Sequence, residues 1–509
     1  MSTALQHTRE DGLGRRGPTL PAAPRSGDEA PRHGSWFARD PAWPIVALLA
    51  GWPLWWALGF APYAMVLLAI PMVNRMYRWR VSGSRVIRVP PGFWLWVLFI
   101  IVQIASVATI ALTAPDTSAS PVSQRVISWL ARTLSYAAAG VLLLYAGNLT
   151  ERELPRRRLA WLLGLVGIYT VIGGILGTVL PTFTFTSPLA LFVPQSLQSS
   201  ASQLGPMLHP ATAQIQDFVG YAHGRPAAPF SYTNMWGNCL AILLPWLFVV
   251  WWAYGTRRQR RAMVAVLLIS FVPAVYSLDR GLWVGLGVAL LYVGIRFAAR
   301  GKLVILGVIC GALTLGAVVI IATPLQELIA ARFANPVSNT GRASDTLIAV
   351  KDAASSPVIG YGDSRHAQGS ASSITLGKTA NCKACGQSVI GGDGQMQLLL
   401  VSSGFVGAGL YVAFFGYGLW RYRRDTTPYG LAAAIVILQG FVFMFVYEAV
   451  GAPLAFTMFS YALLWRNDMA RRQADTATRA PAAQARPQRY AITAGATPIN
   501  AGVTSSWRG

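Results

Sequence analysis

Long stretches without charged side chains constrain this chain more than any other feature of its sequence. An α-helix needs roughly 20 apolar residues to cross the hydrocarbon core of a membrane. Twelve segments are candidates: 43–58, 61–74, 91–113, 126–148, 159–180, 231–254, 262–277, 281–297, 303–323, 395–418, 429–447 and 450–465. The first two are short and contain prolines, so one broken hairpin is an alternative for them. The sequence predicts an all-α, polytopic membrane bundle of about 12 transmembrane helices over residues 43–466.

The formal net charge of +23 needs an explanation in a chain with only 12% charged residues. In a soluble protein such an excess would suggest a nucleic-acid partner. Here, alternate short connections hold nineteen Lys and Arg residues: Arg75, Arg78, Arg80, Arg85, Arg88, Arg152, Arg156, Arg157, Arg158, Arg257, Arg258, Arg260, Arg261, Arg296, Arg300, Lys302, Arg421, Arg423 and Arg424. Short cytoplasmic loops of membrane proteins are enriched in these residues. We therefore expect both termini in the cytoplasm, contact with membrane lipids and no nucleic-acid partner.

The two ends of the chain differ in composition from the apolar region. Residues 1–42 are rich in Pro, Gly and Arg, and residues 467–509 are rich in Ala, Arg, Gln and Thr. Neither end has an apolar period, so both are predicted to be disordered cytoplasmic tails. Residues 1–42 also lack the apolar core of a cleavable signal peptide. The first apolar segment would then serve as an uncleaved signal.

Two long segments fall on the predicted outer face, at 181–230 and 324–394. Loops of this length are commonly functional. The second loop contains a predicted amphipathic helix from Arg342 to Ala354, which ends before Pro357. Its apolar face would hold Ala343, Leu347, Val350 and Ala354, with Asp345, Lys351 and Asp352 pointing away from that face. The sequence thus predicts a large, partly helical outer loop.

Three outer-face residues could do chemistry. Arg280 lies at the turn between two apolar segments, where an ionisable residue is a functional candidate, although it could also snorkel or pair with Asp279. Arg342 begins the predicted helix and could bind an anion together with free backbone N–H groups, or could be a solvated surface residue. Asp393 stands in a glycine-rich stretch and could act as a base, or simply cap the following helix.

Other polar residues on this face carry weaker signals. His366 is a lone loop histidine, and Glu448 could be either a buried acid or an interfacial one. Cys382 and Cys385 form an isolated C-x-x-C, which suggests a local disulfide or two free thiols rather than a zinc site. The sequence contains no nucleotide-binding or zinc-helix motif. We expect no metal and no cofactor.

Three blocks of sequence, taken in order, resemble the superfamily of O-antigen ligases and Wzy-type polymerases, polytopic glycan transferases of bacterial envelopes. The first block runs from Arg225 to Asn234, and the second is Ser277-Leu-Asp-Arg280-Gly. The third runs from Asn339-Thr-Gly-Arg342 through a helix to Ser356-Pro-Val-Ile-Gly-Tyr-Gly362. The resemblance covers residues 225–465, whereas the first five apolar segments match only in number and character.

The resemblance implies an enzyme of the bacterial inner membrane whose active face points outward. It would move a glycan from a lipid diphosphate donor to an acceptor hydroxyl on a growing glycan, a lipid or a wall polymer. Arg280 and Arg342 would bind the diphosphate, since guanidinium forks suit phosphate oxygens. Asn234 and Asn339 would support them.

One departure from the family concerns the base. The family typically has a His-Asn pair just before the tenth segment, and here Asp393 and Gly394 stand in its place. Asp393 is then the first candidate for the base and His366 the second. A transporter or flippase of lipid-linked glycans is the alternative function, although the two halves of the chain show no convincing internal repeat.

Overall fold

The computed structural model describes residues 40–117, 120–195, 198, 204–217, 222–322, 326–327, 329–330, 337–366, 389–392 and 394–484. The chain divides into two compact units, Met1–Pro41 and Ala42–Gly509. Nearly all of the first unit lies outside the described residues. The account below concerns the second unit.

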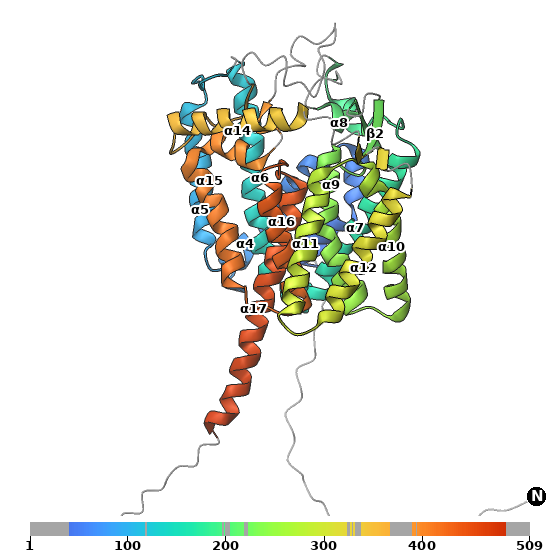
Figure 1. Ribbon diagram of the computed structural model, residues 1–509. Helices are drawn as coiled ribbons and strands as arrows, with labels where there is room; N and C mark the ends of the chain where they lie inside the picture. Colours follow the sequence, from blue (N-terminus) through green and yellow to red (C-terminus); the bar gives the residue numbers. More distant parts are fainter. Residues whose placement is uncertain are drawn as a thin grey trace, which may run out of the picture. The chain divides into compact units, whose positions relative to one another are not determined.

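The second unit is a helical bundle (Figure 1). Its longer helices are α4 (Ala64–Val81), α5 (Phe93–Ala105), α6 (Val122–Asn148), α7 (Arg156–Val179), α9 (Thr233–Phe248), α10 (Arg257–Tyr276), α11 (Arg280–Ala298), α12 (Leu303–Ile321), α14 (Val337–Ser355), α15 (Gln395–Arg421), α16 (Pro428–Phe443) and α17 (Ala452–Gln484). Its shorter helices are α2 (Trp43–Ala50), α3 (Trp52–Leu58) and α8 (Gly205–Leu208). Each predicted apolar segment is therefore largely helical.

Six helices in the described residues are long and apolar enough to cross a membrane: α6, α7, α9 with its π-helical extension to Ala253, α10, α11 and α15. Three shorter apolar helices accompany them, at Phe93–Thr109, Leu306–Ile321 and Pro428–Phe443. The structure thus indicates a multi-pass membrane protein. The predicted count of about 12 is not confirmed, because six helices meet this criterion.

Several predicted spans are too short or too charged to meet the criterion for a membrane-crossing helix, and each has a local reason. The first is divided into α2 and α3 at Gly51, just before Pro53. The second half of α4 carries Arg75, Arg78 and Arg80. The apolar part of α17 is followed directly by Arg466 and a charged extension that stays helical as far as Gln484. The helix therefore passes the predicted boundary at residue 466, and residues 485–509 lie outside the described residues.

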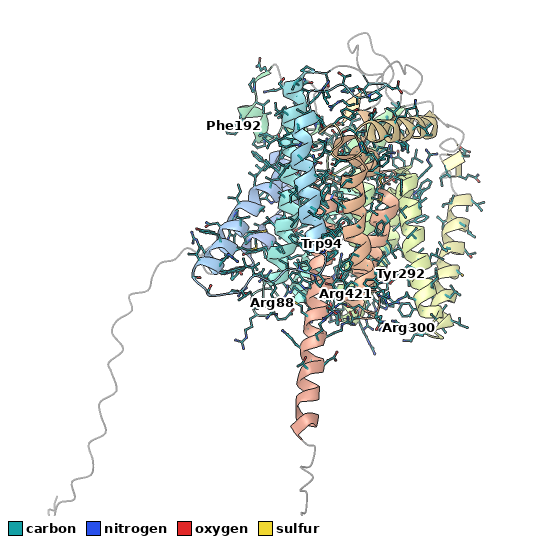
Figure 2. All side chains as sticks on the ribbon, turned by 90° about the vertical axis from the view of Figure 1, so that its left-hand side faces the viewer. Arg88, Trp94, Phe192, Tyr292, Arg300 and Arg421 are labelled. Atoms are coloured by element: carbon teal, nitrogen blue, oxygen red, sulfur yellow. The ribbon has the colours of Figure 1, made fainter. Side chains whose placement is uncertain are left out.

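The arginine-rich connections meet at one end of the bundle, which we call the arginine end. Contacts join them: Arg85 to Glu153, Arg157 to Tyr254, Arg296 to Asp425, and Arg466 to Glu151. Figure 2 shows Arg88, Arg300 and Arg421 at this end and Phe192 toward the other. Charges that are dispersed over the sequence are therefore gathered in space, as the topology prediction requires.

At the opposite end, α14 lies across the bundle (Figure 1), and we call this the α14 end. The prediction of a partly helical large loop is confirmed, and the helix extends N-terminally to Val337. The loops here also contain strands, which the all-α prediction omitted. Strand β1 (Ala213–Asp217) pairs antiparallel with β2 (Ala222–Pro226), and β3 (Arg365–His366) pairs antiparallel with β4 (Val389–Ile390).

The orientation predicted for the faces of α14 is wrong. Leu347 and Val350 on the predicted apolar face are 67% and 42% exposed, whereas Asp345 and Asp352 are 4% and 0% exposed. The face of α14 that packs on α15 is a different one, since it includes Ala349 and Ala353, which are each 0% exposed and belong to the hydrophobic core. There Gln397 donates a hydrogen bond of 3.0 Å from Nε2 to Oγ1 of Thr346.

Aromatic packing holds α5, α6 and α15 together below this end. Trp96 and Phe99 of α5 contact Tyr136 of α6 and Tyr411 and Phe414 of α15. Such aromatic pairs contribute about 0.5–1.5 kcal/mol each beyond burial. Since Tyr136 lies one helical turn from Arg132, the cluster also fixes where Arg132 stands relative to α15.

Candidate functional site

The site begins with a break in α15. Gly404 has φ 64° and ψ −171°, so the helical hydrogen-bond ladder is interrupted there. A positive φ strains residues that carry a Cβ, so glycine suits this position. The break frees the backbone carbonyls of the preceding turn and the N–H groups of the following one.

The loop after α14 fills this break with its own backbone. The N–H of Tyr361 donates to the carbonyl of Val401 at 2.7 Å, and the N–H of Gly362 donates to that of Ser402 at 3.0 Å. In return, the N–H of Val406 donates to the carbonyl of Pro357 at 3.2 Å. The Gly-x-Gly spacing of the third sequence block thus has a structural cause, because the loop backbone must approach the helix backbone directly.

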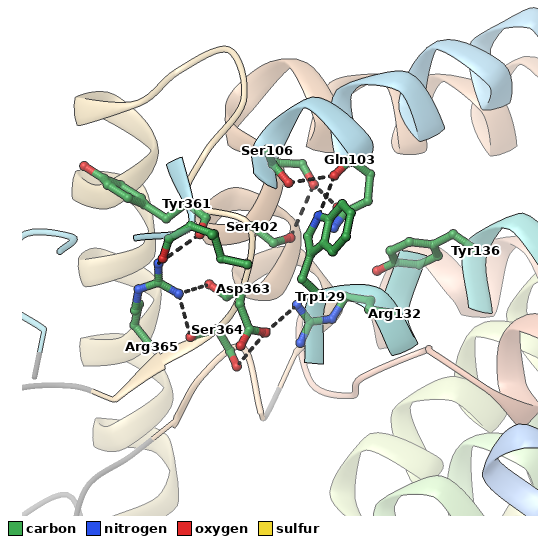
Figure 3. Close-up of polar contacts among 12 residues, drawn as sticks. Gln103, Ser106, Trp129, Arg132, Tyr136, Tyr361, Asp363, Ser364, Arg365 and Ser402 are labelled. Carbon is green, nitrogen blue, oxygen red and sulfur yellow. Dashed lines mark hydrogen bonds and ion pairs between the residues drawn. The ribbon is translucent and has the colours of Figure 1, made fainter. Parts of the chain in front are cut away.

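This docking brings Asp363 to Arg132 of α6 (Figure 3). Their side chains form an ion pair of 2.9 Å between Nη1 and Oδ1, and they are only 10% and 7% exposed. A buried ion pair of this kind loses much hydration, and removal of one partner is strongly destabilising. The pair therefore joins α6 to the loop at the α14 end.

Two more buried guanidiniums, one from α6 and one from the loop after α14, bind the connection between α5 and α6. Arg125 and Arg365 each donate to the carbonyls of Ile110 and Leu112, at distances of 3.2–3.4 Å. Arg365 also donates to the carbonyl of Tyr361 at 2.9 Å. Burial, together with the neighbouring Arg125, lowers the pKa of Arg365 to about 10. These arginines hold backbone, which is a structural role.

A second group forms where the first two sequence blocks meet. Nε of Arg225 donates to the carbonyl of Ser277 at 2.6 Å, and Nη1 of Arg225 donates to Oε1 of Gln216 at 2.7 Å. Nε2 of His223 lies 3.0 Å from the carbonyl oxygen of Tyr276. The strand pair β1–β2 is thereby fixed to the turn between α10 and α11.

Gln395 connects the two groups. Its Nε2 donates to the hydroxyl of Tyr136 at 2.7 Å, and its backbone N–H donates to the carbonyl of Tyr447 at 2.8 Å. The hydroxyl of Tyr447 in turn donates to Asp279, which caps α11 by accepting from the N–H groups of Gly281 and Leu282. A continuous set of polar contacts thus crosses the α14 end from α6 to α11.

The structure brings some predicted residues together and leaves others outside its description. Arg280 is the first residue of α11, half-buried beside Asp279, and Asn234 is half-buried in the first turn of α9. Arg342 and Asn339 lie within α14, but their side chains are outside the described part of the chain. Asp393 and the two cysteines Cys382 and Cys385 are outside the described residues altogether.

His366 lies in β3, half-buried, three residues after Asp363. Burial lowers the pKa of His366, and the nearby Asp363 carboxylate partly opposes this effect. A lowered pKa keeps the imidazole neutral near pH 7, the form that can accept a proton. In the described residues, no cluster of three or more His, Cys, Asp or Glu side chains is arranged to hold a metal ion.

Sequence reasoning missed Arg132. The signal was available, since a single arginine inside the apolar segment 126–148 is a functional candidate by the same rule that selected Arg280. Gln395 was missed as well, and its role depends on contacts with residues 259 and 54 positions away. No short motif encodes contacts of that range.

No protein-family model matches this chain, and no curated protein matches it. The likeness to the O-antigen ligase superfamily therefore rests on the three sequence blocks alone.

Proposed function

We propose that this protein is a glycosyltransferase that moves a glycan from a lipid diphosphate donor to an acceptor hydroxyl, as an O-antigen ligase or polysaccharide polymerase does. One observation carries the proposal. Charged and polar side chains from α6, α11, α15 and the loops converge at the α14 end of an otherwise apolar bundle. A reaction between a membrane-anchored donor and a water-soluble acceptor needs such a boundary position.

The orientation belongs to the proposal. The arginine end would face the cytoplasm under the positive-inside rule, which places the α14 end on the outer face of a bacterial inner membrane. About twelve apolar segments, some of them short or broken, would then make up the membrane domain, with both termini inside.

The diphosphate would lie near Arg280 and Arg342. Charge develops on the diphosphate as it leaves, and stabilising charge where it develops is usually the largest catalytic contribution. Arg280 supports this role by its place at the N-terminus of α11, where the helix dipole also favours an anion. Asn234 and Asn339 are the proposed supporting residues, and the scheme demands no metal and no cofactor.

The proton of the acceptor hydroxyl would be taken by Asp393 or His366. The lowered pKa of His366 supports its capacity as a base. Exchange of the two roles is testable: an Asp393→Asn variant with full activity beside an inactive His366→Ala variant would assign the base to His366.

A transporter of lipid-linked glycans is the second candidate, and the break in α15 favours it, because transporters often use broken helices around their substrate. Here the break is occupied by the loop at 357–362 rather than left open to a substrate. A transporter would move the lipid-linked glycan across vesicles without changing it chemically.

The test begins with the lipid-linked glycan that accumulates in cells lacking the gene. Purified protein in nanodiscs should convert that glycan, and Arg280→Ala and Arg342→Ala should each lower the rate on the order of 10²-fold or more. Arg88→Ala, at the arginine end, is the matched control and should keep the wild-type rate. Unchanged conversion in both test variants, at normal expression, would reject the assignment.

A further inference from the structure

Glu448 occupies the short connection between α16 and α17, at the centre of the polar contacts described above. Both of its chain neighbours are held by Gln395. The carbonyl of Tyr447 accepts from the backbone N–H of Gln395 at 2.8 Å, and the N–H of Ala449 donates to Oε1 of Gln395 at 3.0 Å. Glu448 is therefore presented by a fixed backbone rather than by a free loop.

This backbone places Glu448 between the two charged groups of the site. On one side, the hydroxyl of Tyr447 reaches Asp279, next to Arg280. On the other side, Arg132 is close enough to act on the Glu448 carboxylate electrostatically. Arg132 and Tyr136 are one turn apart on α6, and Tyr136 bonds to the same Gln395 that holds Glu448.

The surroundings of Glu448 suit a group that takes up a proton. Its side chain is exposed to solvent, yet it stands among enough protein atoms that burial raises its pKa. Arg132 opposes this shift, and the Asp363 carboxylate adds to it. A carboxylate becomes a better base as its pKa approaches the working pH.

Three other carboxylates of the polar site and of the α14 helix above it are either engaged or out of reach. Asp363 is paired with Arg132, and Asp279 accepts bonds from Tyr447 and from the start of α11. Asp352 is 0% exposed and cannot meet a substrate. Among the described residues of the polar site, Glu448 is the carboxylate that is open to solvent and accepts no hydrogen bond in the structure.

We propose that Glu448 is a catalytic residue that accepts the proton of the acceptor hydroxyl. This inference rests on the proposed glycosyltransferase function and assigns the base to a residue other than Asp393 or His366. The acceptor oxygen forms a bond to the anomeric carbon while the bond from that carbon to the phosphate oxygen breaks. The lipid diphosphate leaves with the bonding electron pair, and the proton moves to a carboxylate oxygen of Glu448.

In this scheme Arg132 is a positioning residue that acts through Glu448. Its guanidinium is bound to Asp363, so it approaches Glu448 without neutralising it through a direct ion pair. Loss of Arg132 should raise the pKa of Glu448 further, because an opposing positive charge is removed. The acid limb of the pH–rate profile should therefore move to higher pH in Arg132→Met, which a purely structural role would not cause.

The experiment compares Glu448→Gln, Glu448→Ala, Arg280→Ala and Asp116→Asn in nanodiscs, with the lipid-linked glycan extracted from cells lacking the gene as the donor. Asp116 is the matched control, since its exposed carboxylate lies at the same end and pairs with Lys351 at 3.2 Å. Glu448→Gln should lower kcat by about 10²–10⁴-fold with little change in the donor KM. Sodium formate should restore part of the kcat of Glu448→Ala and none of that of Arg280→Ala.

The outcomes separate this inference from the proposed function. If Arg280→Ala is inactive while Glu448→Gln keeps the wild-type kcat and pH profile, the inference is overturned and the glycosyltransferase function stands. If Glu448→Gln is inactive but formate fails and the residual pH profile is unchanged, Glu448 has a structural role and the inference is also overturned. A wild-type protein that converts none of the glycan overturns both.

Discussion

The ion pair of Arg132 and Asp363 is almost fully buried, so each charge relies on the other for its stabilisation. Removal of one partner leaves an uncompensated buried charge, at a cost of about 3–5 kcal/mol. We therefore expect Asp363→Ala to lower the free energy of unfolding by that amount, measured by chemical denaturation in detergent micelles. Glu153→Ala should cost less than about 1 kcal/mol, since its pair with Arg85 is more exposed, at 20% and 24%.

The double variant Arg132→Met/Asp363→Leu sharpens this prediction. Apolar replacement of both partners avoids the unpaired charge, so the double variant should be more stable than either single variant. A double variant that loses the sum of the two single losses would show that the side chains contribute independently, contrary to the pairing.

Asp352 makes stability depend on pH. Burial raises its pKa to about 7, above the value of about 3.9 for an unfolded chain. Between these values the folded protein holds a proton that the unfolded chain releases, so stability should fall as the pH rises from about 4 to about 7 and then level off. Neither oxygen of this carboxylate has a hydrogen-bond partner in the described residues, so its charged form is costly.

Replacement of Asp352 by asparagine should remove that slope and raise the thermal midpoint at pH 8. The measurement is thermal unfolding from pH 4.5 to pH 8, with Asp475→Asn as the control, since Asp475 is exposed on the α17 extension. A slope that survives in Asp352→Asn would assign the pH dependence to other groups.

At the scale of elements, the break in α15 and the loop that fills it form one unit. A Cβ on Gly360, at φ 61°, would stand 2.6 Å from backbone atoms of Ser403 and Gly404. Backbone atoms cannot move aside as the end of a flexible side chain can. Gly360→Ala should therefore lower the free energy of unfolding by about 2–4 kcal/mol and displace Asp363 from Arg132. Activity in the nanodisc assay should fall with stability.

The matched control is Gly409→Ala, which lies in α15 after the break. A Cβ there meets no heavy atom within 4 Å, so the substitution should be neutral or stabilise the helix by up to about 1 kcal/mol. Equal losses of stability in Gly360→Ala and Gly409→Ala would mean that disturbed docking of the loop does not cause the destabilisation.

The helix α14 shows where periodicity stops being informative. The spacing of Ala343, Leu347, Val350 and Ala354 correctly predicts a helix with one apolar face, but it does not say what that face meets. The usual assumption that the most apolar face turns toward the protein fails here, since the buried face instead combines Ala349 and Ala353 with Asp345 and Asp352. Membrane proteins break that assumption often, since their apolar surface can also face lipid.

For the molecule as a whole, topology is the first property to measure. Val86 is 82% exposed and lies between Arg85 and Arg88 in the sequence, at the arginine end, whereas Phe192 is 80% exposed and lies toward the α14 end (Figure 2). In a variant without native cysteines, Phe192→Cys should react with a membrane-impermeant maleimide in intact cells. Val86→Cys should react only after the inner membrane is permeabilised. The reverse pattern would invert the proposed orientation and move the polar site to the cytoplasm.

Much of this architecture can be predicted from local sequence, and the polar site much less so. Runs without charge give the helices, and the arginine distribution gives one end of the bundle. The length of each helix is harder to predict from the sequence, because the breaks at Gly51 and Gly404 depend on packing partners. The polar site is not predicted because Arg132 pairs with Asp363, and Tyr136 with Gln395, across more than two hundred residues, and no sequence periodicity records such contacts.

The loop that fills the break in α15 also has a consequence for biosynthesis. Residues 357–362 leave the ribosome before α15, so the carbonyls of Val401 and Ser402 do not exist when their hydrogen-bond donors are made. Chains are synthesised from the N-terminus and their parts fold in that order. The loop must therefore wait undocked at the membrane surface until α15 is inserted. The polar site at the α14 end would be completed late, so a ribosome that stalls before residue 400 leaves a bundle in which this site is incomplete.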